Sequence, residues 1–177
     1  MIRQAKDILS ILDGKDEFTE NETFLFQKLA IFDYLIGNLD RHEENWLVTF
    51  SSVNEITHIK AIDNANAFPK IQPEKGSPAA RNQYLWKELK ISDQKFSPEI
   101  INFVQDMITP DKLIKVVVDI KKECGDFLDE DMKNLLLLRQ KVIYKLICEE
   151  DGKTPKDLAD ISTKEEMEAY GQPLKHG

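Results

Sequence analysis

The sequence predicts a mainly α-helical domain that carries one small β-hairpin. Three observations lead to this fold class: helical apolar periodicity at both ends of the chain, two adjacent β-type runs in its centre, and cap-plus-proline signals that open two helices in its second half. With 177 residues, 41% of them hydrophobic, the chain is long enough to form one domain with a sizeable core.

Two helices are expected before the hairpin. The first is a short helix over residues 3–12, which Gly14 helps to end. The second begins at the pattern Thr19-x-x-Glu22, which is typical of a capping box. Its apolar residues over 24–36 face nearly all directions, and a helix that is apolar on most sides is expected to lie at the centre of the core.

The centre of the chain is expected to contain the hairpin and a loop. Residues 46–50 and 56–62 are β-type runs joined by a short polar turn, which predicts two antiparallel strands. Residues 70–79 contain two prolines and a glycine and are expected to form an exposed loop. A helix is expected to follow over residues 80–89.

The second half is expected to pack helix on helix. Ser97-Pro98 and Thr109-Pro110 each combine an N-cap residue with proline at the first helical position. The last two of the predicted helices are short, charged and expected to be peripheral. Helices are expected over residues 97–107, 109–124, 129–148, 154–160 and 162–170.

Charge and hydropathy exclude several classes of protein. With 32 acidic and 24 basic residues the net charge is −8, which is unsuited to sequence-independent nucleic-acid binding, so no nucleic-acid partner is expected. The apolar runs are shorter than a membrane span, and the first residues have no signal-peptide core. Cys124 and Cys148 lie outside any CxxC motif, which argues against a disulfide framework. The chain is expected to be cytoplasmic or peripheral at a membrane, and not secreted through a signal peptide.

Polar residues gather in two loops on either side of the predicted hairpin. The apolar helix leads into Asn38, Asp40, Arg41 and Asn45, and the second strand leads to Asp63. The hairpin arms are of similar length, so these two loops are expected to converge. Phosphoryl transfer to a hydroxyl needs a carboxylate for the acceptor proton, and an amide and a second carboxylate to hold magnesium. Asp40 and Asn45 have the spacing of the kinase catalytic aspartate and metal-binding asparagine.

Two segments carry a resemblance to a known family. Residues 32–48, FDYLIGNLDRHEENWLV, resemble the catalytic loop of the phosphatidylinositol 3-/4-kinase-like superfamily. They are closest to the type II phosphatidylinositol 4-kinases, whose loop reads D-Y-x-x-x-N-x-D-R-x-x-x-N-W-L. Residues 61–69, AIDNANAFP, are similar to the metal-binding segment of that family, I-D-N-G-x-A-F-P. The HipA-like serine/threonine kinases share a shorter version of the first motif.

The resemblance implies the C-terminal lobe of a protein-kinase-like fold, in which the small hairpin carries the metal-binding loop. The whole chain, residues 1–177, is then expected to be one such lobe. Its expected parts are the catalytic loop over 38–46, the hairpin over 46–62, the metal loop over 63–69 and a helical remainder over 80–170.

The family's roles also carry over by resemblance. Asp40 is implied to be the catalytic aspartate, and Arg41 is implied to support the catalytic loop by pairing with an acidic neighbour. Asn45 and Asp63 are implied to bind Mg²⁺ or Mn²⁺. Asn38 is implied to fix the loop backbone and, with those two residues, to form the cofactor-binding set for the co-substrate ATP. The implied activity is a phosphotransferase that acts on a hydroxyl.

The sequence departs from the family pattern in two places. Ala65 stands where the type II enzymes have glycine, which permits backbone conformations that alanine disfavours. The residues before Asp40 contain no glycine-rich loop and no lysine in a strand pattern, which kinases use to hold nucleotide phosphates. The chain alone is therefore expected to be incomplete and inactive. An N-terminal lobe is expected to come from the full-length chain or from a partner protein.

Three functions stay open at this point. The acceptor implied by the closest family is a phosphoinositide lipid. A protein serine or threonine, as in the HipA-like branch, is the alternative acceptor. A non-catalytic binding module of the pseudokinase type is the alternative from a different class.

Overall fold

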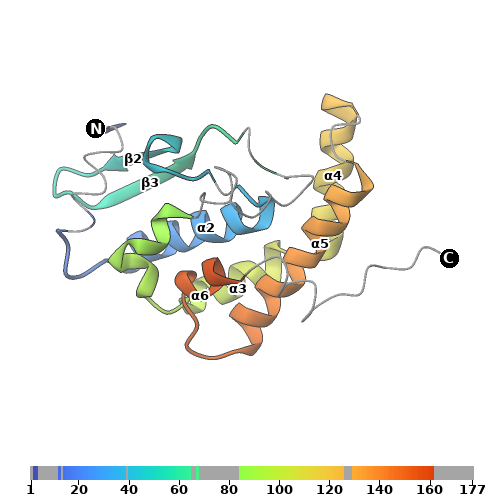
Figure 1. Cartoon of the computed structure of the whole chain (residues 1–177). Coiled ribbons are helices and arrows are strands. Elements are labelled where there is room, and N and C mark those ends of the chain that lie inside the picture. The colour runs from blue at the N-terminus through green and yellow to red at the C-terminus, as the bar shows by residue number, and fades with distance from the viewer. Residues whose placement is uncertain are drawn as a thin grey trace, which may run out of the picture.

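The computed structural model shows a mainly helical lobe with a small antiparallel sheet on one side, which is the C-terminal lobe of a protein-kinase-like fold (Figure 1). The hairpin lies along one side of a central helix, α2, the helices α3, α5 and α6 pack on its other sides, and α4 packs on α5. The structure describes residues 2–3, 12, 14–38, 40–64, 67, 84–125 and 129–161.

Helix α2 (Glu20–Ile36) is the central element that the sequence predicts. Thr19 is its N-cap, and the reciprocal hydrogen bonds between Thr19 and Glu22 form the predicted capping box. Between Phe26 and Ile36 most side chains are buried by contacts with the sheet and several other helices, whereas Phe32 is exposed. Gly37 ends it in the left-handed conformation, with φ of 66°.

Strands β2 (Trp46–Phe50) and β3 (Ile56–Ala61) form the predicted hairpin, with Val48 opposite Ile59. A third strand, β1 (Ile2–Arg3), pairs antiparallel with the other edge of β2. The helix expected over residues 3–12 is therefore wrong at its first residue, which the ladder with β2 holds extended. Residues 4–11 of that prediction lie outside the described part of the chain.

Four of the five helices predicted for the second half are present in the described residues. Ser97 and Thr109 each cap a helix that has proline in its first turn, and Asp129 caps a third. The third helix continues into a π-helical turn, η5 (Lys145–Glu149), so the predicted helix 129–148 has a change of pitch in its last part. The helices are α3 (Pro98–Met107), α4 (Pro110–Cys124), α5 (Glu130–Tyr144) and α6 (Pro155–Asp160).

Two predictions about these elements are wrong. The described end of the helix expected over residues 80–89 is a 3-10 turn, Leu85–Glu88. The Ser92 hydroxyl donates to backbone carbonyls of this segment, which gives the chain an alternative to a regular helix. Helix α6 is not peripheral, because it packs on α2 and its Leu158 is fully buried. The predicted loop 70–79 and helix 162–170 lie outside the described residues.

The core beneath the sheet is aromatic. The Trp86 ring stacks on Tyr84 with 5.0 Å between centroids and meets Phe26 of α2 edge-on at 6.0 Å. Trp46, the first residue of β2, is also buried. This packing fixes α2 and the start of β2, between which the catalytic loop lies. Among the described residues, no helix has both the length and the apolar character needed to span a bilayer.

Candidate active site

The predicted catalytic loop begins at the C-terminal end of α2. Gly37 turns the chain, and the buried side chain of Asn38 follows. Asn38 Oδ1 accepts a hydrogen bond from the Asp40 backbone N–H at 3.2 Å, and Nδ2 donates to Asp63 O and Asn64 Oδ1, both at 3.4 Å. One amide side chain therefore joins the predicted catalytic loop to the predicted metal loop.

Within the catalytic loop, Asp40 and Asn45 are next to each other. Asn45 Nδ2 donates to the Asp40 carbonyl at 2.8 Å, and the His42 N–H donates to the same carbonyl at 3.0 Å. His42 also caps a short 3-10 turn, η1 (Glu43–Asn45), by accepting from the Glu44 N–H. The loop is thus folded back on itself, and the backbone of Asp40 is fixed by three hydrogen bonds, two to its carbonyl and one from its N–H to Asn38.

The buried guanidinium of Arg41 connects the parts of the site. Its Nε donates to the two carboxylate oxygens of Asp33 on α2, at 2.9 and 3.1 Å. Its Nη1 donates to the Asn45 carbonyl and, at 2.6 Å, to the Ile62 carbonyl. Its Nη2 donates to Asn64 Oδ1 at 2.5 Å. Arg41 therefore pairs with an acidic neighbour, as expected, and holds both loops to the helix.

Asp33 is the acidic partner, and it lies fully buried in α2. Besides Arg41, it accepts a hydrogen bond from Trp86 Nε1 at 3.0 Å, and its backbone carbonyl accepts from the Tyr84 hydroxyl at 3.3 Å. Burial raises the pKa of Asp33 to about 6, although Arg41 and Trp86 both act to lower it. The carboxylate is ionised at neutral pH, but its environment opposes the charge.

Asp63 lies just beyond the end of β3. The N–H of Ile62 donates to the Asn45 carbonyl at 2.9 Å, so the catalytic loop and the start of the metal loop are joined directly through the backbone. Asp63 has a φ of 49°, the left-handed region that aspartate tolerates better than most residues. Residues 65, 66, 68 and 69 of the predicted metal loop lie outside the described residues.

All five predicted site residues are thus found in two loops that share hydrogen bonds. Asn45 and Asp63 supply amide and carboxylate oxygens, the hard donors that Mg²⁺ and Mn²⁺ take. Because Asn45 Nδ2 donates to Asp40, the amide presents Oδ1, the atom able to bind a cation, on its other side. The described residues contain no cluster of three or more histidine, cysteine or acidic side chains that could hold a metal by itself. A cation here would take its remaining ligands from phosphate oxygens and water.

No site role was expected from the sequence for Asp33, Asn64 or Trp86. The structure shows all three in the network around Arg41. A signal for Asp33 was present, since it is the one acidic residue in the largely apolar stretch 24–36, and a carboxylate buried there needs a partner. The role of Trp86 depends on long-range packing and had no local signal.

Comparisons with known proteins agree with this arrangement. The family model of phosphatidylinositol 3- and 4-kinases matches residues 14–123, which include both loops. The chain is 26% identical over 152 residues to phosphatidylinositol 4-kinase type 2-alpha of Xenopus laevis. The matched region covers 75% of this chain and 32% of that relative. The chain is 27% identical over 156 residues to the Danio rerio type 2-alpha protein, and covers 34% of it. It is 27% identical over 158 residues to the Mus musculus type 2-beta protein, and covers 33% of it.

The chain therefore spans about one third of the length of the curated relatives it matches. The family match is much longer than the two motifs and covers more than half of the chain. It extends from the segment before α2 to the end of α4. By sequence, this chain belongs to the phosphatidylinositol 3- and 4-kinase family.

Proposed function

We propose that this chain is the catalytic C-terminal lobe of a phosphoinositide kinase, and that residues 1–177 form that single lobe. The observation that carries the proposal is the connection of the two loops through Asn38 and Arg41, which gathers Asp40, Asn45 and Asp63 at one end of α2. Family membership supports phosphoryl transfer as the reaction. The names of the type 2 phosphatidylinositol 4-kinase relatives favour a phosphoinositide acceptor.

In this proposal Asp40 receives the proton of the acceptor hydroxyl. The acceptor oxygen forms a bond to the γ-phosphorus of ATP, the bond from that phosphorus to the β–γ bridging oxygen breaks, and ADP leaves. Asn45 Oδ1 and the Asp63 carboxylate would hold Mg²⁺ or Mn²⁺, which when bound neutralises negative charge on the phosphates. The two hydrogen bonds to the Asp40 carbonyl and the one to its N–H keep this residue in place.

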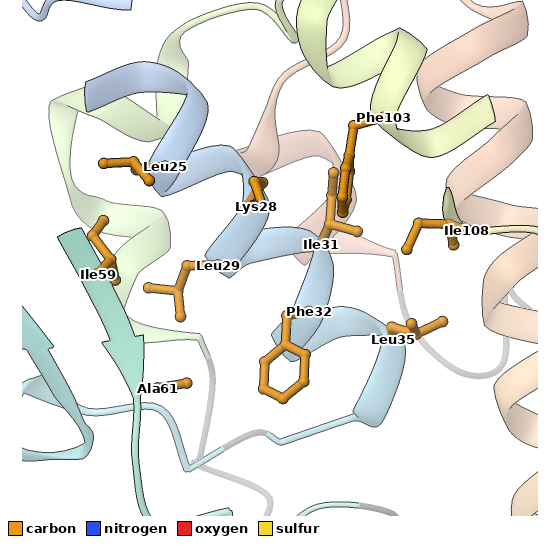
Figure 2. A pocket seen from close by; sticks show the side chains of 10 residues that line it. All are labelled: Leu25, Lys28, Leu29, Ile31, Phe32, Leu35, Ile59, Ala61, Phe103 and Ile108. Carbon is orange, nitrogen blue, oxygen red and sulfur yellow. The ribbon is translucent and has the colours of Figure 1, made fainter. Parts of the chain in front are cut away.

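A groove beside α2 supports the further proposal that a second, N-terminal lobe completes the enzyme (Figure 2). The cavity has a volume of about 300 Å³ and lies between α2, β3 and the end of α3. Its walls are apolar except for Lys28, whose ammonium lies 5.1 Å from the centre of the Phe103 ring. Phe32, which Figure 2 shows pointing out from α2, is 40% exposed. The residues that line the groove are Leu25, Lys28, Leu29, Ile31, Phe32, Leu35, Ile59, Ala61, Phe103 and Ile108.

The groove combines apolar walls with one exposed aromatic side chain, Phe32, which apolar residues of another domain can cover. The groove reaches Ala61, two residues before Asp63, so a lobe seated on it would lie beside the metal loop. Nucleotide phosphates in kinases are held between the lobes, by a covering loop and a lysine of the N-terminal lobe. We therefore propose that apolar residues of that lobe occupy the groove.

The groove proposal is tested by purifying tagged chain from its own cells and identifying what accompanies it. Phe32→Asp places a charge in the groove, and Val53→Asp places one at the hairpin tip, where Val53 is 71% exposed. A co-purifying polypeptide with a glycine-rich loop and a strand lysine is expected with wild type and Val53→Asp, and is expected to be lost with Phe32→Asp. Equal recovery with both variants would reject the groove as the contact.

The activity is tested on the same preparation with labelled ATP and Mg²⁺. Vesicles that contain phosphatidylinositol and a mixture of protein acceptors are supplied in separate reactions, and Asp40→Ala is purified in parallel. Label in the lipid alone, absent with Asp40→Ala, is the expected result. Label in protein alone would reject the lipid acceptor and select the HipA-like alternative. Equal, background incorporation by wild type and Asp40→Ala would reject catalysis and favour a binding module.

A further inference from the structure

Arg139 of α5 lies directly beneath the turn that leads into the catalytic loop. It is 4% exposed, although it comes from a helix far along the sequence from that loop. An ideal β-carbon placed on Gly37 would lie 1.8 Å from Nη1 of Arg139 and 2.6 Å from its Cζ. Glycine suits position 37 because of its φ of 66°, and a side chain at this position would have to displace the Arg139 guanidinium.

The charge of Arg139 suits this position. The C-terminal end of a helix carries a partial negative charge, and the last turn of α2 contains no basic residue of its own. Arg139 brings a cation to this end from a different helix. After Gly37, the Asn38 N–H donates to the Asp33 carbonyl at 3.1 Å, and Asp40 follows two residues later.

Helix α5 holds Arg139 firmly in place. The neighbouring residue, Gln140, is also buried and donates from Nε2 to the Ile108 carbonyl at 3.0 Å, which ties α5 to the turn between α3 and α4. Val142 and Ile143 are fully buried on the next turn of α5. A side chain on a well-packed helix is a more precise support than one on a loop.

We propose that Arg139 is a positioning residue that sets the turn from Gly37 to Asp40 and so keeps the Asp40 carboxylate aimed at its reaction partner. Arg139 acts through the Gly37 backbone and touches no reacting atom. The catalytic meaning of this support rests on the proposed function, whereas the support itself is a property of the fold.

The test is amide hydrogen exchange on the full chain, without nucleotide. Arg139→Met removes the charge and keeps a long side chain, and Gln140→Met is the matched control at a neighbouring buried polar site. With Arg139→Met, protection of the Asn38 and Asp40 amides is expected to fall at least tenfold, while that of the β2–β3 ladder changes less than twofold. With Gln140→Met, the Asn38 and Asp40 amides are expected to stay within twofold of wild type.

Two results would overturn the proposal. One is unchanged protection at Asn38 and Asp40 in folded Arg139→Met, and the other is an equal loss at the loop and the ladder with both variants. Should Arg139→Met fail to fold, Arg139→Lys keeps the charge but not the planar shape, and it is expected to show the same selective loss in smaller degree. Selective loss with Arg139→Met, together with no phosphoryl transfer by the purified wild-type complex, would reject the proposed function and leave the positioning role standing.

Discussion

A buried carboxylate of α2 links this helix to strand β3 through hydrogen bonds at each end of the strand, and the two links differ. At the start of β3, Glu22 accepts a hydrogen bond from the Ile56 N–H at 2.9 Å. Beyond its end, Asp33 holds Arg41, which donates to the Ile62 carbonyl at 2.6 Å. Neither side chain is exposed to solvent, but Asp33 lies deeper in the protein than Glu22 and has different partners.

The Glu22 end is well satisfied as an anion. Burial alone raises its pKa, but the Lys15 ammonium and the backbone N–H groups of Thr19 and Ile56 outweigh that effect, and the pKa is lowered. This end has only structural neighbours, the capping box of α2 and the first residue of β3. The charge of Glu22 therefore stabilises the folded chain.

At the other end of β3, the surroundings of Asp33 disfavour its charged form. Its pKa is raised to about 6 because burial outweighs the contributions of Arg41 and Trp86. The unfavourable charge is thus that of Asp33, which organises the candidate active site. The charge of Glu22, which only joins α2 to β3, is favourable. Local costs of this kind are concentrated at functional sites.

The largest difference between the two ends of β3 is expected when the cation that pairs with each carboxylate is removed. Arg41→Met leaves the Asp33 carboxylate buried without its partner and is expected to lower the free energy of unfolding by about 3–5 kcal/mol. Lys15→Met is expected to cost about 1 kcal/mol, because Glu22 keeps two backbone donors. Urea unfolding at pH 7 measures both, and equal losses would show that the two ends are equivalent.

The two ends are also expected to respond to pH with opposite sign. The lowered pKa of Glu22 contributes stability above its unfolded value of 4.5, and this is lost as the pH falls. The raised pKa of Asp33 contributes stability below 3.8, and this is lost as the pH rises through about 6. The Asp33 shift corresponds to about 3 kcal/mol across that window.

Urea unfolding of wild type, Glu22→Gln and Asp33→Asn between pH 4 and 7.5 separates these contributions. The stability of wild type relative to Asp33→Asn is expected to fall with rising pH. Relative to Glu22→Gln it is expected to rise or stay level. Slopes of the same sign in both differences would contradict the contrast between the two carboxylates.

At pH 7, replacing each carboxylate with its neutral amide compares the two ends by their effect on the free energy of unfolding. Glu22→Gln loses a stabilising anion and is expected to lower the free energy of unfolding by about 1–3 kcal/mol. Asp33→Asn removes an unfavourable charge but leaves the buried Arg41 guanidinium without its counter-ion, so it is expected to cost about 3–5 kcal/mol and to reduce phosphoryl transfer by the purified complex. An Asp33→Asn variant with wild-type stability and full activity would contradict the role given to the Asp33–Arg41 pair.

The smallest effects are expected at two residues with positive φ, one beside each end of β3. Asn54 has a φ of 59° and Asp63 a φ of 49°, and glycine adopts both readily. Asn54→Gly and Asp63→Gly are each expected to stay within about 0.5 kcal/mol of wild-type stability. Binding of Mn²⁺ and ATP, measured by calorimetry, is expected to survive the first change and to be lost with the second. Its survival with Asp63→Gly would place the metal elsewhere.

Much of the fold could be predicted because local signals agreed with the final packing. The capping box at Thr19 and the proline starts at Ser97 and Thr109 placed three helices correctly, since caps act within a single turn. The segment around Trp86 was wrongly predicted as a helix. Its position is set by contacts with Phe26 and Asp33, which no local pattern records.

The candidate site shows the same limit. The spacing of Asp40 and Asn45 and the motif at Asp63 identified the two loops, because those residue types follow from the chemistry itself. Of the supports, Asp33 carried a signal in the sequence but not the identity of its partner, and Arg139 carried none. Each acts on a partner that only the folded chain brings near. The metal-binding and catalytic roles stay predictions.

The central claim is that Asp40, Asn45 and Asp63 form one site around one divalent cation. Titration of the ¹⁵N-labelled chain, within the purified complex, with Mn²⁺ and ATP tests it, because the paramagnetic ion broadens the amide signals of residues near it. The account predicts that the amides of residues 40–45 and of 62–64 broaden together, and that Asp63→Asn abolishes broadening in both loops. Broadening of one loop alone, or in both loops unchanged by Asp63→Asn, would contradict it.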